Sequence, residues 1–253
     1  MAGWSRETDR SQCNADGATG VAIGVGRAVL VNGRRPLVMG DRGVYLACCG
    51  RPVVPWAASE GSATVLIDGL HAVGQGTVTT HQAGRGVLVD GSADVLVGGP
   101  TITMEELARA DALDLLAKGE AALRRWNTQD RQHFKEWFGV DSQDAREVLL
   151  AEIPDMRDRI RTVRFEQDDD DVYAHVRPWG DTIFLERKFW LSPRLGRDSR
   201  AGVVIHETSH FWGAGSTVDR TYGQGPSRAL ARDLGPFAQG NADNVEYYFE
   251  GLK

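Results

Sequence analysis

The sequence is poor in cysteine and has no long apolar run. Its 253 residues contain three cysteines, all in the first fifth of the chain, and Cys48 and Cys49 are adjacent. An odd number with one adjacent pair is a poor basis for a disulfide framework, so we expect the chain to fold in a reducing cytosol. No stretch of about 18 apolar residues exists, which predicts that no segment spans a membrane. Residues 1–20 lack the apolar core of a secretory signal peptide.

Basic residues are in the minority. The chain has 29 Lys and Arg against 35 Asp and Glu, for a net charge of −6, which argues against a nucleic-acid partner. Its length suits one large or two modest domains. The first hundred residues are rich in glycine and short β-branched runs, whereas helical periodicity dominates the rest. The sequence therefore predicts two domains, residues 1–100 and 101–253.

Two histidines in the second half have the spacing of metal ligands on a helix. His206 and His210 are four residues apart, so on a helix both side chains share a face and can reach one ion. Glu207 lies beside them, where a carboxylate can take a proton from a metal-bound water. Asp219 is a candidate third ligand, which would leave the fourth position of a zinc ion open. The pattern is typical of a zinc hydrolase, and the alternative is an exposed helical turn with two histidines.

Three segments in this half follow one another in a recognisable order. They are HETSH (206–210), STVDRTYG (216–223) and NADNVEYYF (241–249). In this order they resemble the HExxH, GTxDxxYG and NADxxEYF-like segments of the deuterolysin and peptidyl-Lys metalloendopeptidase family, the aspzincins. The resemblance covers roughly residues 103–253 and implies an α+β, zincin-like metallopeptidase domain. Ser216 stands where that family usually has glycine.

The resemblance also implies roles for single residues. His206, His210 and Asp219 would bind the catalytic Zn²⁺, and Glu207 would act as general base and then as proton donor to the leaving amine. Tyr222 would stabilise the oxyanion. The alternative for Tyr222 is a core aromatic residue with a satisfied hydroxyl.

Asp243 and Glu246 are the acidic residues of the third segment. They are three positions apart and share a face of a predicted helix. In the lysine-selective members of the family, acidic residues at the matching positions line the pocket for a substrate lysine. The alternatives are surface charges or a carboxylate favoured by the helix dipole. If they line a pocket, its ligand is a lysine of a protein or the diamino acid of a peptidoglycan stem.

Repeated short segments mark the first hundred residues. GSATVLIDG (61–69) and GSADVLVGG (91–99) begin thirty residues apart, and AVLVNG (28–33) is similar. This spacing indicates stacked hairpins or a small β-solenoid. Asn32-Gly33 and Asp68-Gly69 favour tight turns, because both dipeptides accept positive φ. We expect a small all-β domain.

Part of this region resembles a PAAR domain. VNGRRPLVMGD (31–41) is similar to the repeated GSxxVxINGxPAARxGD-like unit of those domains, and DGLHAVGQ (68–75) is a degraded second unit. The resemblance implies a cone of repeated β-hairpins that caps the spike of a type VI secretion machine, with a zinc ion near its point. The candidate ligands of this second, structural Zn²⁺ are His81, one of Cys48 or Cys49, and less directly Cys13 and His71. The alternative is a set of unliganded loop side chains.

Helical periodicity begins directly after residue 100. Thr103 and Glu106 have the spacing of a capping box. We expect helices over 104–126, 128–138 and about 143–160. The acidic run 168–171 is interpreted as the turn of a hairpin that joins strands near 163–165 and 172–176, and a further short strand is expected at 181–185.

The two resemblances combine into one hypothesis. The chain would be a type VI secretion effector that folds in the bacterial cytoplasm, binds a trimeric spike protein through residues 1–100 and is secreted into a target cell. There its peptidase would hydrolyse peptide bonds of a protein or peptide substrate, and an immunity protein is an expected partner. The competing hypothesis is a structural spike tip. Its zinc domain would act on peptidoglycan stem peptides or serve as a non-catalytic module that binds a metal or a partner.

Overall fold

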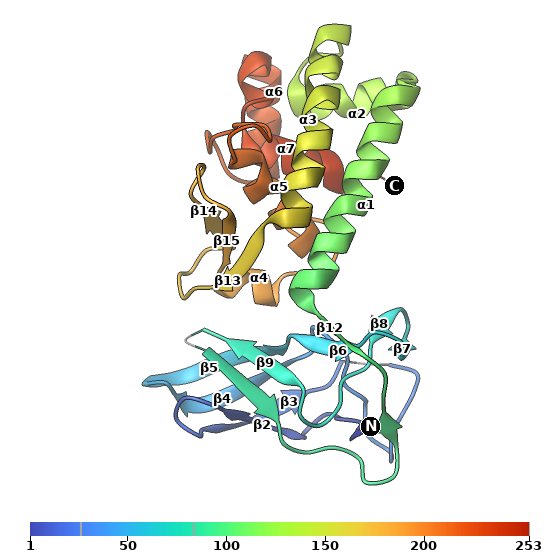
Figure 1. Cartoon of the computed structure of the whole chain (residues 1–253), viewed down its shortest axis with the longest axis vertical. Coiled ribbons are helices and arrows are strands. Elements are labelled where there is room, and N and C mark those ends of the chain that lie inside the picture. Colours follow the sequence, from blue (N-terminus) through green and yellow to red (C-terminus); the bar gives the residue numbers. More distant parts are fainter. Residues whose placement is uncertain (26, 83, 253) are drawn as a thin grey trace. The chain divides into compact units, whose positions relative to one another are not determined.

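The computed structural model describes residues 1–25, 27–82 and 84–252 (Figure 1). The chain divides into two compact units. The first contains Met1–Leu107 and the short segments Asp168–Asp171 and Glu186–Leu191, and the second contains the rest. The strand β12 (Thr101–Thr103) and the first residues of helix α1 (Met104–Arg125) thus group with the first unit.

The first unit is built around a closed barrel with the strand order β10-β2-β3-β4-β5-β9, in which all neighbours are antiparallel. In β2 and β3 exposed and buried residues alternate, because successive side chains of a strand point to opposite faces. The fully buried side chains of Tyr45, Trp56 and Leu88 fill the interior. The barrel strands are β2 (Arg10–Cys13), β3 (Thr19–Ile23), β4 (Arg42–Cys48), β5 (Arg51–Ala58), β9 (Val78–His81) and β10 (Gly84–Leu88).

Three short antiparallel pairs accompany the barrel. They are β1 (Ala2–Gly3) with β11 (Leu96–Val97), β6 (Glu60–Ser62) with β12, and β7 (Leu66–Ile67) with β8 (Leu70–His71). The unit is therefore all-β, as predicted. Of the two arrangements that the repeat indicated, the β-solenoid is wrong, because the antiparallel strands close into a barrel instead of stacking in coils.

The repeated segments take the same local turn in both places. The hydroxyl oxygens of Ser62 and Ser92 accept hydrogen bonds from the N–H groups of Val65 and Val95 at 3.1 and 3.0 Å. The internal repeat is therefore a repeat of turns. The expected tight turns are also confirmed, since Asn32, Gly33, Asp68 and Gly69 all have positive φ, between 51° and 75°.

The second unit combines helices with a small sheet. Thr103 and Glu106 form the predicted capping box at the start of α1, with N–H to side-chain oxygen distances of 2.9 and 3.2 Å. The expected helices are present. The chain continues with α2 (Thr128–Phe138), α3 (Gln143–Thr162), β13 (Arg164–Gln167), β14 (Ala174–Val176), β15 (Thr182–Leu185), α4 (Arg187–Leu191), which belongs to the first unit, α5 (Arg200–His210), α6 (Gln224–Ala238) and α7 (Ala242–Glu250).

The predicted hairpin across the acidic run is wrong. The sheet order is β13-β15-β14, with β13 parallel and β14 antiparallel to β15, so the two expected partners are separated by the later strand. β15 is the most buried of the three and therefore takes the central position, where both its edges are paired.

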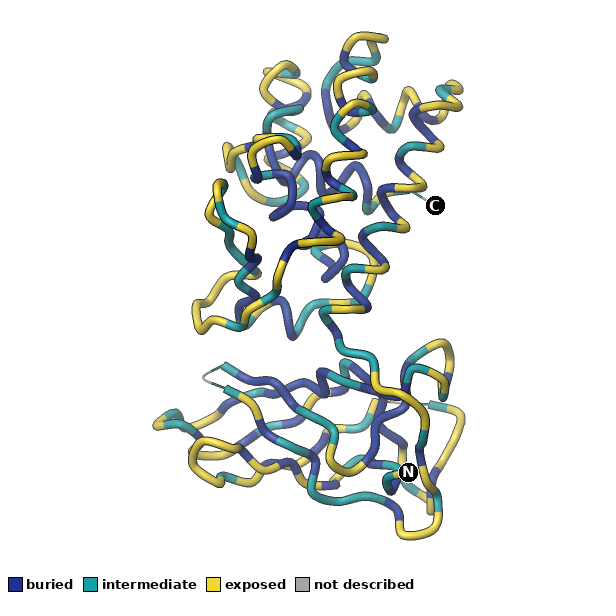
Figure 2. The backbone as a smooth tube through the Cα atoms, in the orientation of Figure 1, coloured by how far each residue is buried: buried dark blue, intermediate teal, exposed yellow. Residues whose placement is uncertain are grey.

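Helices α5 and α7 form the centre of the second unit. Figure 2 shows both in dark blue along most of their length, and nearly every residue of the two helices is buried. They pack closely because position 202 is a glycine: a Cβ there would overlap the carboxylate of Glu250. Across the described residues, none of the helices is both long and apolar enough to cross a bilayer.

Candidate metal centre and active site

The start of α5 is fixed by hydrogen bonds from both sides. The Ser199 hydroxyl accepts the N–H of Gly202 at 3.0 Å and caps the helix. The same hydroxyl donates to Glu250 Oε1 at 2.7 Å, and Glu250 also accepts the N–H of Ser199 at 2.8 Å. Because Glu250 ends α7, these bonds hold the start of α5 against the end of α7, and none of them involves a metal ligand.

Helix α5 and the loop after it bring three donor atoms together. Asp219 Oδ1 lies 3.2 Å from His206 Nε2 and 3.4 Å from His210 Nε2. Bonds of about 2.0–2.1 Å from zinc to nitrogen or oxygen place tetrahedral ligand atoms about 3.3 Å apart. Both distances match that spacing, and the three donor atoms all lie within 4.8 Å of one another, so the donor set fits one tetrahedral zinc ion and leaves one position open. The three residues that the sequence singled out thus lie together.

The other nitrogen of each imidazole is held from behind. His206 Nδ1 lies 3.1 Å from both Asp243 Oδ1 and Glu246 Oε2 on α7, and His210 Nδ1 donates to the carbonyl of Thr217 at 3.0 Å. Such partners select the tautomer that presents Nε2 to a metal and raise the basicity of the ligand. Asp243 and Glu246, predicted to line a substrate pocket, are buried behind His206.

The loop that carries Asp219 is held by Asn241, a residue for which no role is predicted from the sequence. Asn241 is fully buried, and its side-chain oxygen accepts the N–H groups of Arg220 and Thr221 at 2.8 and 3.2 Å. Val218 and Asn241 also form a parallel β-bridge. The position of this asparagine, directly before α7, was visible as the first letter of the third motif. Its role depends on α7 packing beside the loop.

Ser216, which stands where the similar segments usually have glycine, has a backbone conformation that favours glycine. Ser216 has φ 53°, in the left-handed region that favours glycine. The chain turns there so that Thr217 can bond back to α5, where its N–H donates to the Ser209 carbonyl at 3.0 Å and the two hydroxyls lie 2.6 Å apart. The serine therefore keeps the turn at a cost in backbone strain.

Negative charge is in excess around the two histidines. Burial alone would lower the pKa of His206, but Asp219, Asp243 and Glu246 outweigh it and raise the pKa well above its usual value. Burial alone would raise the pKa of Asp219, yet hydrogen bonds from both histidines hold it far below its usual range. Burial raises the pKa of Glu207, which faces the same groups. Carboxylates gathered in a buried site favour a bound cation.

Tyr222 differs from the other candidates in its exposure. Its side chain is 66% exposed, so the alternative of a core aromatic residue is wrong. Partial burial and the neighbouring Asp219 raise the pKa of Tyr222 to about 12. The phenol therefore keeps its proton near neutral pH and can donate a hydrogen bond.

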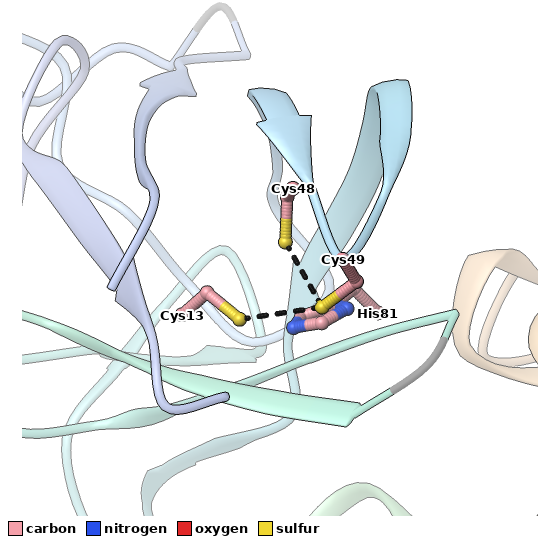
Figure 3. Close-up of side chains that lie close together, drawn as sticks. All are labelled: Cys13, Cys48, Cys49 and His81. Carbon is pink, nitrogen blue, oxygen red and sulfur yellow. Dashed lines mark hydrogen bonds between the residues drawn. The ribbon is translucent and has the colours of Figure 1, made fainter. Parts of the chain in front are cut away.

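In the first unit the structure assembles four of the five candidate ligands. One side-chain donor atom from each of Cys13, Cys48, Cys49 and His81 lies within 4.8 Å of the others (Figure 3). All three cysteines are free thiols. His71 is placed elsewhere, with its Nδ1 2.8 Å from the Ser62 carbonyl.

The second unit can be assigned to a class of enzyme. A helix that presents two imidazoles and a buried glutamate, followed by an aspartate at tetrahedral spacing, defines a metallopeptidase site of the HExxH class. The family model described as lysine-specific metallo-endopeptidase, aspzincin, matches residues 124–250, about half of the chain. The chain belongs to this family.

Individual proteins similar to this chain are also peptidases. An extracellular protease of Aeromonas hydrophila is 33% identical over 57% of this chain and 43% of that protein. A peptidyl-Lys metalloendopeptidase of Grifola frondosa is 31% identical over 79% of this chain and 56% of that protein. The chain thus spans about half the length of these two relatives. The solved structure of a zinc peptidase from Grifola frondosa matches with a TM-score of 0.54 and 31% identity, over 57% of this chain and 91% of that one. The chain therefore contains a domain of the zinc metalloendopeptidase type.

Proposed function

We propose that the second unit is a zinc-dependent endopeptidase that is selective for lysine. The observation that carries the proposal is the spacing of Asp219 Oδ1 from the two Nε2 atoms, 3.2 and 3.4 Å, with the buried carboxyl of Glu207 beside them. Zinc bound there would polarise a substrate carbonyl and lower the pKa of a water.

The residues of the chain divide the remaining work. Glu207 takes the proton of the attacking water and returns it to the leaving amine, a task suited to a carboxyl whose pKa is raised by burial. Asp243 and Glu246 hold the His206 ring so that Nε2 stays in place. Tyr222, protonated and exposed, donates a hydrogen bond to the oxygen on which charge develops.

Two observations support the preference for lysine: the name of a relative and the carboxylates near the site. The curated Grifola frondosa relative is named a peptidyl-Lys metalloendopeptidase. In this chain the buried carboxylates of Glu207, Asp243 and Glu246 lie close to the more exposed carboxylate of Asp219. The resulting negative potential favours an ammonium group next to the site.

A peptide library with cut sites mapped by mass spectrometry tests the selectivity. In Asp243→Asn we expect the preference of kcat/KM for lysine over alanine to fall about tenfold or more, because one of the carboxylates that make the local potential negative is neutralised. Asp233→Asn removes an exposed carboxylate on α6 and serves as the matched control. Unchanged selectivity in a zinc-loaded Asp243→Asn chain would refute the role of this buried charge in the preference for lysine. Cleavage of peptidoglycan stem peptides alone would favour the competing substrate.

We further propose that the chain is a type VI secretion effector, folded in the bacterial cytoplasm and delivered into a target cell. The PAAR-like segment 31–41, the repeated turns at Ser62 and Ser92 and the all-β fold of the first unit support this proposal. A trimeric spike protein and an immunity protein would be its partners. A structural zinc ion in the first unit is a separate proposal, which does not depend on the secretion role.

Capture experiments test the secretion role. The tagged full chain should retain a purified trimeric spike protein and should not retain an unrelated trimeric β-helical protein. Equal retention of both, or of neither, contradicts the spike-tip role and leaves the peptidase proposal untouched.

A further inference from the structure

Three hairpin strands of the barrel bring thiols and an imidazole to one place. Cys13 ends β2, Cys48 ends β4, Cys49 follows in the turn to β5, and His81 ends β9. Figure 3 shows the three sulfur atoms and the His81 ring converging between these strand ends. Cys13, Cys48 and His81 are almost completely buried. The cluster therefore lies inside one end of the barrel and joins segments far apart in the sequence.

The spacing of the sulfur atoms fits a metal better than a disulfide. Cys49 Sγ lies 3.7 Å from Cys13 Sγ and 3.4 Å from Cys48 Sγ. Zinc–sulfur bonds of about 2.3 Å place tetrahedral thiolates about 3.8 Å apart, whereas bonded sulfurs are about 2.05 Å apart. One donor atom from each of the four residues lies within 4.8 Å of the others, as a single tetrahedral ion requires.

The backbone has the conformation that lets adjacent cysteines converge. Successive side chains of a strand point to opposite faces, so Cys48 and Cys49 could not face one point in extended chain. Cys49 instead has φ 52°, and Gly50 after it has φ 73°. The N–H of Cys49 also donates to Asp16 Oδ2 at 2.5 Å, from the turn that follows Cys13. The two cysteine-bearing turns are thus held to each other by a hydrogen bond outside the cluster.

We propose that Cys13, Cys48, Cys49 and His81 bind one structural zinc ion that ties the hairpins together at this end of the barrel. Four protein ligands leave no open position, which separates this site from the three-ligand site on α5. Its thiolates prefer soft or borderline metals such as zinc, cobalt and cadmium to magnesium or calcium. The inference rests on the structural zinc of the proposed function, and is independent of the secretion role and of the peptidase.

Metal counting on the full chain tests the site. The protein is purified under reducing conditions, stripped with a chelator and reloaded with Zn²⁺ or Co²⁺. We expect about two zinc ions per wild-type chain and about one in His81→Asn or in the pair variant Cys13→Ser/Cys49→Ser. His71→Asn changes a buried histidine of the same unit outside the cluster and should keep about two. Cobalt should give a thiolate-to-metal absorption that His206→Asn retains and the pair variant loses.

A readout on the wild-type chain covers the case in which a variant does not fold. Zinc should slow alkylation of the three thiols by iodoacetamide about tenfold or more relative to the stripped chain, since a bound thiolate is a poor nucleophile. Unprotected thiols, a disulfide among the three cysteines or no thiolate absorption with cobalt would overturn the proposal. Peptidase activity is followed in parallel. Cleavage by a His81→Asn chain that has lost one zinc ion would show that the two sites are separate.

Discussion

Asn241→Ala tests how the loop that carries Asp219 is held. The side-chain oxygen of Asn241 accepts two N–H groups of that loop, and its nitrogen donates to Asn244 Oδ1 at 2.7 Å. Hydrogen bonds of this kind contribute about 1 kcal/mol each, and a buried group left unpaired costs about 1–3 kcal/mol. Arg220 is exposed, so water replaces part of the loss there. We expect the variant to lose about 2 kcal/mol of unfolding free energy and to hold Asp219 less firmly.

Asn241→Ala should also lower the affinity of the α5 site for zinc. Loss of a residue that orients a ligand weakens metal binding by about 10–100-fold. The assay is peptidase activity as a function of buffered free zinc, because activity reports this site and not the barrel. Gln239→Ala is the matched control: its side chain lies two residues earlier and donates to the Ala145 carbonyl at 2.8 Å, away from the loop. A folded Asn241→Ala chain with an unchanged zinc midpoint would refute the reasoning.

Three further predictions concern strain, burial and the metal. Ser216→Gly should raise the unfolding free energy by about 0.5–1 kcal/mol, because it relieves the strain of a left-handed backbone conformation. Ser142→Gly, at a position with φ −78°, should not raise it, and thermal melts of the two variants make the comparison. Burial raises the pKa of Glu152 from 4.5 to about 7, so the folded chain holds this proton more tightly than the unfolded chain does. The stability that results is fully present below pH 4.5 and is lost as pH rises through 7. Glu152→Gln should therefore stabilise the fold by about 1 kcal/mol at pH 8, after allowance for partial exposure, and change little at pH 4. A chelator should abolish cleavage and added zinc restore it, and cleavage that survives complete metal removal would contradict a zinc peptidase.

Features set by neighbouring residues were predictable from the sequence. The four-residue spacing of His206 and His210 fixes their common face on any helix. The Thr103–Glu106 pair, followed by apolar residues at helical spacing, is a local signature of a helix start. Asn32-Gly33 turned as expected because the requirement for positive φ is local. Asp219 is a candidate third ligand from the residues themselves, and the resemblance implies the same role, but spacing alone does not fix where a residue of the loop after α5 lies.

Features set by distant pairing were not predictable in the same way. The order β13-β15-β14 depends on which strand is buried most deeply, and barrel closure depends on β10 meeting β2 across more than sixty residues of chain. The roles of Asn241, and of Asp243 and Glu246 behind His206, depend on α7 packing against α5. No local pattern in the sequence encodes these contacts.

The central claim is that His206, His210 and Asp219 hold a catalytic zinc ion on which Glu207 acts. The most direct test measures zinc content and peptide cleavage together in wild type and Glu207→Gln. Since Glu207 is not in the donor set, the variant should keep its zinc and lose cleavage by about a hundredfold or more, the usual contribution of a general base. A zinc-loaded Glu207→Gln chain that cleaves at the wild-type rate would contradict the account.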